Sequence, residues 1–117
     1  MRTVTFGSQE HTRIVVIDAR HSTFGNASHK YKIQLVDGKT LGEVNFQLGP
    51  VKENGRNGVH NEDLLCIVAD RLAGFQGGKF ACEENSDALD AVIEALGHLR
   101  KRTEIRKARN VEGTNRA

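Results

Sequence analysis

The residues best suited to chemistry lie in the second half of the chain, and they are of the types that a compact nucleotide needs. Phe75 and Phe80 offer aromatic faces on which a base can stack, and Asn85 offers an amide that can pair with base edges. The guanidinium groups that could bind phosphate come later, at Arg102, Arg106 and Arg109. These residue types favour the binding of a compact anionic ligand over catalysis.

Each of these residues also has a simpler structural interpretation. Phe75 and Phe80 flank a glycine-rich stretch, where hydrophobic plugs close a helical hairpin. Arginines in the last turns of a helix compensate its dipole while remaining solvated, although one or two are enough for that. Residue types alone therefore leave both interpretations open.

Groups for catalysis or metal binding are not arranged in a recognisable pattern. Five histidines are scattered without the spacing of metal ligands, at His11, His21, His29, His60 and His98. Glu83 and Glu84 are adjacent carboxylates, but at the start of a helix they favour its dipole. The chain has no Gly-x-Ser-x-Gly, Walker or zinc motif. We therefore expect no enzyme activity, no metal and no cofactor.

Two helices joined by the loop at residues 75–82 must position the candidate residues. We expect the first helix to be capped by Asn61 and to stop at Gly74. Its expected buried face consists of Leu64, Leu65, Ile67, Val68 and Leu72. The second helix is predicted from about Glu84 to Ala108, because Leu89, Val92, Leu96 and Leu99 form one apolar stripe that Thr103 and Arg106 continue as polar residues.

Helix geometry links this site to assembly. Asn85 and Arg102 are 17 residues apart, which on one helix is about 25 Å and beyond the reach of one small ligand. If both contact the same molecule, one of them must come from a second, antiparallel chain, and the site lies at a two-fold interface. The apolar stripe of the second helix is the expected surface for this dimer.

The first half of the chain is typical of β-structure. Alternating or β-branched runs occur at residues 3–6, 13–18, 31–36 and 41–46, and Asp37-Gly38 is a hairpin signal of the two-residue type. Residues 21–29 are expected to form a loop. The predicted fold class is α+β, with a small N-terminal antiparallel sheet of about four strands followed by an antiparallel two-helix hairpin.

We expect a single domain over residues 1–117, made of a β-rich segment (1–48), a connector (49–60), the hairpin (61–109) and a tail (110–117). The connector contains Pro50 and the Asn54-Gly55 and Asn57-Gly58 dipeptides, which favour tight turns. Such turns can form an anion-binding nest or a plain linker.

Charge is uneven although the formal net charge is only +2. Residues 100–109 contain six basic side chains and Glu104 alone, whereas acidic residues prevail over residues 83–94. This distribution favours self-assembly or a compact anionic ligand over a long nucleic acid. Cys66 and Cys82 have no metal or redox spacing, and no apolar run is long enough for a bilayer, so a reducing cytoplasm and no membrane contact are expected.

Several motifs together resemble a hairpin domain of phage anti-defence proteins. They cover about residues 45–114 and include Asn45-Phe46-Gln47, Gly49-Pro50, Asn61-Glu62-Asp63-Leu64-Leu65, Gly74-Phe75-Gln76, Phe80-Ala81-Cys82, Arg102-Thr103 and Arg109-Asn110-Val111-Glu112-Gly113-Thr114. The resemblance is to sponges that sequester the immune signals of Thoeris and CBASS systems, and the β-rich segment is more similar to the anti-Thoeris branch.

The resemblance implies capture without turnover in the cytoplasm of a host bacterium. Its implied ligands are glycocyclic ADP-ribose and, at separate sites, cyclic dinucleotides or trinucleotides. Its implied assembly is a homo-oligomer in which dimers build a hexamer. The implied roles are base stacking for Phe75, a polar contact for Asn85 and phosphate binding for Arg102. The second-rank candidates are Arg71, Phe80, Arg106 and Arg109.

Two positions depart from the family pattern, and two other functions remain open. Lys79 stands where proline is expected, and Asn110 replaces a glycine whose left-handed conformation asparagine can adopt. The main alternative is a phage accessory protein that binds nucleic acid through its basic C-terminal helix; a phosphodiesterase ranks third, since it lacks a metal site or base. In the β-rich segment, Arg20, Lys30 and Lys32 could serve a second phosphate or protect an edge strand from aggregation.

Overall fold

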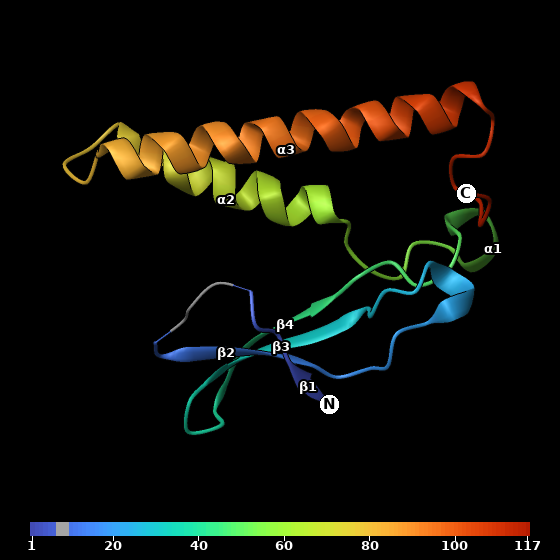
Figure 1. Ribbon diagram of the computed structural model, residues 1–117, viewed down its shortest axis with the longest axis horizontal. Coiled ribbons are helices and arrows are strands. Elements are labelled where there is room, and N and C mark those ends of the chain that lie inside the picture. The colour runs from blue at the N-terminus through green and yellow to red at the C-terminus, as the bar shows by residue number, and fades with distance from the viewer. Residues whose placement is uncertain (7–9) are drawn as a thin grey trace. The chain divides into compact units, whose positions relative to one another are not determined.

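The computed structural model describes residues 1–6 and 10–117. The chain divides into two compact units, Met1–Val59 and His60–Ala117, which are described separately below. The first unit contains an antiparallel sheet and the second contains two long helices (Figure 1). The predicted α+β class is confirmed.

The sheet has four strands in sequential order, and each strand is antiparallel to the next (Figure 1). The strands are β1 (Arg2–Thr3), β2 (Thr12–Val16), β3 (Lys30–Leu35) and β4 (Thr40–Asn45). The β-branched residues of β2 suit a central strand, and Val16 is fully buried. β1 is shorter than predicted, although the Val4 N–H still donates to the Ile14 carbonyl at 2.9 Å.

The hairpin between β3 and β4 forms where Asp37-Gly38 predicts it, but with a longer loop. The Leu35 N–H donates to the Lys39 carbonyl at 2.8 Å, so three residues rather than two lie between the paired ends. Gly38 has a φ of +100°, which a side chain would strain, and the Asp37 carboxylate accepts from the Lys39 N–H at 2.9 Å.

The loop between β2 and β3 is held by one carboxylate. Asp18 accepts hydrogen bonds from the backbone N–H of His29 at 3.0 Å and of Lys30 at 2.9 Å. The chain between them contains a single 3₁₀ turn, η1 (Ser22–Phe24), followed by Gly25 and Asn26 with positive φ. Residues 21–29 therefore form an ordered loop, as predicted, because Asp18 replaces the missing strand partners.

The connector is cross-linked by two amide side chains. Gln47 donates to the Gly55 carbonyl at 2.7 Å and accepts from the Asn57 N–H at 3.0 Å, while Asn57 accepts from the Leu48 N–H at 2.8 Å. The connector also contains an unpredicted short helix, α1 (Val51–Asn54). Because these backbone amides are used within the chain, the linker interpretation is favoured over an anion nest.

The second unit is built from α2 (Asn61–Gln76) and α3 (Glu83–Ala108), which pack side by side (Figure 1). The stripe residues Leu89, Val92, Leu96 and Leu99 are all half-buried. The predicted buried face of α2 is partly wrong, because Ile67 remains 65% and Val68 44% exposed. The stripe of α3 is thus partly covered within the hairpin, and Ile67 and Val68 of α2 contribute exposed apolar surface instead.

Both predicted ends of α2 shift. His60, not Asn61, is the N-cap residue, and its backbone N–H donates to the Asp63 carboxylate at 2.9 Å. The helix continues through Gly74, beside which there is open space, and ends where the Gly77 N–H donates to the carbonyls of Ala73 and Gly74. One glycine inside a helix costs about 1 kcal/mol, which packing against a neighbour can offset.

Candidate functional site

The loop of the helical hairpin is closed by Gln76, the last residue of α2. Its amide nitrogen donates to the Cys82 carbonyl at 3.1 Å, and its amide oxygen accepts from the Cys82 N–H at 3.1 Å. The Cys82 thiol then caps α3 by accepting from the Asn85 N–H at 3.4 Å. These bonds fix the spacing between the end of one helix and the start of the next.

Four of the predicted site residues meet at this loop. The rings of Phe75 and Phe80 are edge to face, with centroids 6.2 Å apart and planes at 84°. The Arg71 guanidinium lies 5.0 Å from the centroid of Phe75, one helical turn away on α2. Asn85 donates to the Phe80 carbonyl at 3.4 Å. The loop therefore joins an aromatic pair, a cation and an amide.

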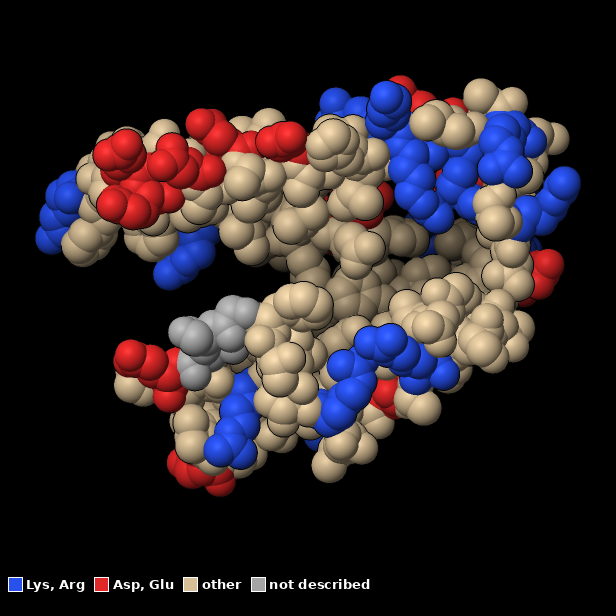
Figure 2. All heavy atoms as spheres, in the orientation of Figure 1, with Lys and Arg blue, Asp and Glu red and all other residues tan. Residues whose placement is uncertain are grey.

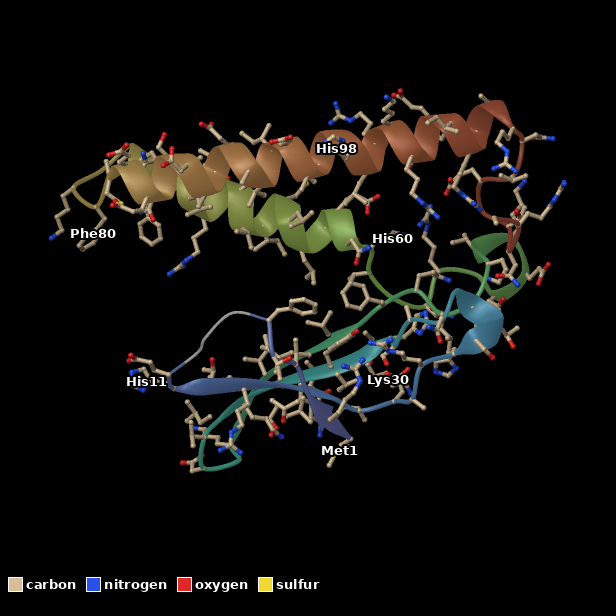
Figure 3. The ribbon with its side chains drawn as sticks, viewed as in Figure 1. Met1, His11, Lys30, His60, Phe80 and His98 are labelled. Carbon is tan, nitrogen blue, oxygen red and sulfur yellow. The ribbon has the colours of Figure 1, made fainter. Side chains whose placement is uncertain are left out.

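Phe80 is the accessible member of the aromatic pair. Its side chain is 64% exposed at the loop end of the hairpin, where Figure 3 labels it, whereas Phe75 is half-buried. The ammonium of Lys79 lies 5.3 Å from the Phe80 centroid. The lysine that departs from the family pattern thus places a second cation beside the aromatic pair.

Arg106, at the other end of α3, is occupied within its own chain. Its side chain is almost completely buried, with 9% of the residue exposed. It donates to the Glu112 carboxylate at 3.2 Å and to the backbone carbonyls of Val111, Thr114 and Arg116. These bonds hold the tail after α3 against the helix. We therefore assign Arg106 a structural role instead of the ligand contact expected from its type.

The tail turns back at Asn110. This residue has a φ of +58°, so the prediction that asparagine keeps the left-handed conformation is confirmed. The turn brings Val111 beneath the end of the helix, where only 1% of it is exposed. Val111, Glu112 and Thr114 together surround the Arg106 guanidinium.

Two of the predicted site residues at this end, Arg102 and Arg109, have exposed side chains. Neither guanidinium group has an ion-pair or hydrogen-bond partner among residues 1–6 and 10–117. Because α3 is continuous from Glu83 to Ala108, Asn85 and Arg102 remain about 25 Å apart along it. Within one chain, the loop cluster and the free arginines are two separate sites.

Figure 2 shows how charge divides along the helical hairpin. Acidic side chains gather over the first turns of α3, which contain Glu83, Glu84 and Asp87, and basic side chains gather over its last turns. The two ends of one helix are complementary in sign. An antiparallel second copy would therefore place each acidic end beside a basic one.

The β-containing unit has a hollow of about 300 Å³. Its lining residues are His29, Lys30, Asn45, Phe46, Leu48 and Asn57. Of the basic residues considered in this segment, Lys30 lines the hollow, whereas Lys32 lies 3.7 Å from the Glu43 carboxylate across the sheet.

Sequence reasoning missed the bonds of Gln76 and the burial of Arg106. The two hydrogen bonds between Gln76 and Cys82 could not be predicted from a sequence motif, because an amide side chain that bonds a remote backbone leaves no periodic signal. Arg106 was placed by residue type alone, without the tail that surrounds it. The five histidines have no metal-ligand spacing in the sequence, but the loop between β2 and β3 brings His21 and His29 together beside Asp18.

The fold and these sites define a class of protein: a small α+β chain whose helical hairpin presents an aromatic cluster at its loop and free arginines near its far end. None of the helices in the described part of the chain is long and apolar enough to cross a membrane.

Comparison with known proteins identifies the family. The family model of the Acb2/Tad1 hairpin domain matches residues 39–104, more than half of the chain. The chain is also 50% identical over 95 residues to the protein "Thoeris anti-defense 1" of Bacillus phage SBSphiJ7. This match covers 81% of the chain and 66% of that protein, just under two thirds of its length. The chain belongs to the Acb2/Tad1 hairpin domain family.

Proposed function

We propose that this protein binds cyclic nucleotide immune signals, glycocyclic ADP-ribose first among them, and holds them without degradation. The observation that supports this function best is the meeting of Arg71, Phe75, Phe80 and Asn85 at the loop of a family hairpin. An aromatic pair with cations beside it suits a purine ring attached to phosphates. Sequestering the signal would keep it from the Thoeris effector.

Phosphate binding falls to Arg102 and Arg109 in this proposal. Their guanidinium groups are exposed and unpaired within the part of the chain that the structure describes, so no internal bond must break before a ligand binds. Arg106 supports them indirectly, since it holds the turn that follows Arg109. Charge-assisted bonds to phosphate are among the stronger hydrogen bonds in proteins.

A complete site needs two copies of the chain. Asn85 and Arg102 lie too far apart on α3 to contact one small molecule, so we propose that an antiparallel partner supplies the second group. Ile67, Ile93 and Ile105 are at least half exposed on the two helices and provide apolar surface for such a dimer. Dimers would then assemble into a larger homo-oligomer, a hexamer in our proposal.

A capture-and-release experiment tests this function. Purified protein is mixed with glycocyclic ADP-ribose or a cyclic oligonucleotide, filtered, and then heated to release what it holds. A sponge removes the ligand from the first filtrate and returns it intact after heating. Altered ligand would instead reveal an enzyme.

Arg102→Ala tests the assignment of the phosphate contact. Loss of one charge-assisted bond of about 1.5–3 kcal/mol should weaken binding roughly 10-fold to 100-fold, as measured by calorimetry. Arg100→Ala is the matched control, because it removes the same charge two residues away on a different side of α3. Equal affinities of the two variants would remove Arg102 from the site.

The exposed basic end of α3 also supports a second candidate, binding to a nucleic acid strand. Arg100, Lys101 and Lys107 are exposed there together with Arg102 and Arg109. Affinity would then fall steeply with salt and grow with strand length. A nucleotide sponge should show one saturable stoichiometry and little dependence on length.

A further inference from the structure

The loop between β2 and β3 places three metal-binding groups around one point. The Asp18 Oδ2 is hydrogen-bonded to the His21 Nε2 at 2.9 Å, a contact that a shared metal ion would replace, and lies 3.9 Å from the His29 Nδ1. All three donor atoms are within 4.8 Å of one another. In a tetrahedral zinc site, donor atoms stand about 3.3 Å apart, which falls between the two measured distances.

One ring nitrogen of His29 is buried without a hydrogen-bond partner among the described residues. The residue is only 8% exposed, and its Nδ1 has no hydrogen-bond partner within the described residues. The Asp18 Oδ2 lies 3.9 Å from this nitrogen, which is too far for a hydrogen bond. A buried polar atom without a partner is unfavourable, and a bound cation would supply one.

The surrounding loop holds the three side chains in place. The Asp18 Oδ1 accepts from the His29 N–H at 3.0 Å and from the Lys30 N–H at 2.9 Å, at the start of β3, where Figure 3 labels Lys30. The His21 N–H donates to the Ala27 carbonyl at 3.1 Å, which closes the turn between the two histidines. The rings of His21 and His29 meet edge to face at 5.3 Å. Such outer contacts orient metal ligands.

We propose that Asp18, His21 and His29 bind one zinc ion per chain, with water completing the tetrahedron. Two imidazole nitrogens and one carboxylate oxygen form a donor set that zinc accepts. The ion would join the end of β2 to the start of β3 and stabilise the loop between them. This site is separate from the proposed nucleotide site and does not depend on it.

Zinc binding to the full chain tests the proposal. The protein is stripped with a chelator and titrated with zinc against a chromophoric competitor, and the bound metal is counted by mass spectrometry. We expect one zinc per chain, a rise in the thermal midpoint, and tetrahedral cobalt absorption when Co²⁺ replaces Zn²⁺. A protein that takes up no zinc in this titration would overturn the site.

Matched variants distinguish this site from other donors. His21→Ala should weaken zinc binding more than about 100-fold, since the loss of an outer partner alone costs up to that much. His98→Ala is the control, because this exposed histidine lies 3.5 Å from Glu94 and outside the cluster. All variants are made with Cys66→Ser and Cys82→Ser, because both thiols are exposed and could bind zinc themselves.

His21 is the better ligand to replace, because it is less buried than His29. His21 is 35% exposed, so its removal should leave the sheet folded, as circular dichroism can verify. Zinc affinity in His21→Ala equal to that of the parent would contradict the proposal, whatever the behaviour of the more buried His29→Ala.

Discussion

Different kinds of interaction stabilise each of the two units internally. In the unit Met1–Val59, polar side chains fasten remote backbone: Asp18 binds the N–H groups of His29 and Lys30, and Gln47 and Asn57 tie the connector. In the unit His60–Ala117, two helices pack through half-buried stripes, and α2 contains no buried residue. The first unit depends on specific bonds and the second on apolar contact.

This difference predicts how each unit responds to change. Adding or removing one atom at a specific hydrogen bond or close contact lowers the stability of the fold strongly, because no neighbouring group can take over the lost interaction. A half-exposed apolar surface is instead only partly buried within one chain, and a second copy of the chain can bury the rest of it. The β-containing unit should therefore be sensitive to local geometry, and the helical hairpin to its state of assembly.

Gly58→Ala should give the largest effect of the substitutions that compare the two units. A Cβ at Gly58 would lie 2.4 Å from the Phe46 carbonyl carbon and 2.6 Å from the Asn45 oxygen, both backbone atoms that cannot move aside. We expect a loss of about 3 kcal/mol in the free energy of unfolding, measured with denaturant. The parallel bridge between Phe46 and Val59 should open as well.

Gly42→Ala is the matched control in the same unit. A Cβ there meets nothing within 4 Å, and the residue lies in β4 without a positive φ. We expect its stability to stay within about 0.5 kcal/mol of the parent. Equal losses of stability in the two variants would show that the close backbone contact at Gly58 does not determine the stability of this unit.

Arg106→Ala should have the next largest effect, and it probes the cluster of side-chain hydrogen bonds at the C-terminal end of the helical unit. Its loss leaves the carbonyls of Val111, Thr114 and Arg116 without their donor. We expect destabilisation by about 2 kcal/mol and release of the tail, seen as faster hydrogen exchange over residues 110–117. Arg102→Ala, which removes an exposed arginine, should leave this exchange unchanged.

The sequence predicted the periodic parts of both units and missed the specific bonds. The stripe from Leu89 to Leu99 repeats at helical spacing, so it identifies α3 without knowledge of its neighbour. The bonds of Gln47 and Gln76 join residues across loops, and a single amide side chain leaves no pattern. The aromatic cluster was found through residue type and family resemblance, whereas the burial of Arg106 depends on a tail whose path no periodicity describes.

The smallest of these effects concerns assembly and the exposed apolar surface of the helical hairpin. Ile67 is 65% exposed on α2, in the middle of a regular helix. If it becomes buried between copies, Ile67→Lys should weaken the dimer by about 1.5 kcal/mol, roughly tenfold, with the fold retained. Analytical ultracentrifugation over a range of concentrations measures this change.

Val36→Lys supplies the control from the other unit. Val36 is 51% exposed in the loop between β3 and β4, so the substitution adds the same charge to a comparable apolar side chain. We expect this substitution to leave the dissociation constant of the dimer unchanged. If Val36→Lys dissociates the protein and Ile67→Lys does not, the subunit contact belongs to the sheet, and the antiparallel pairing of α3 that joins Asn85 to Arg102 has no support.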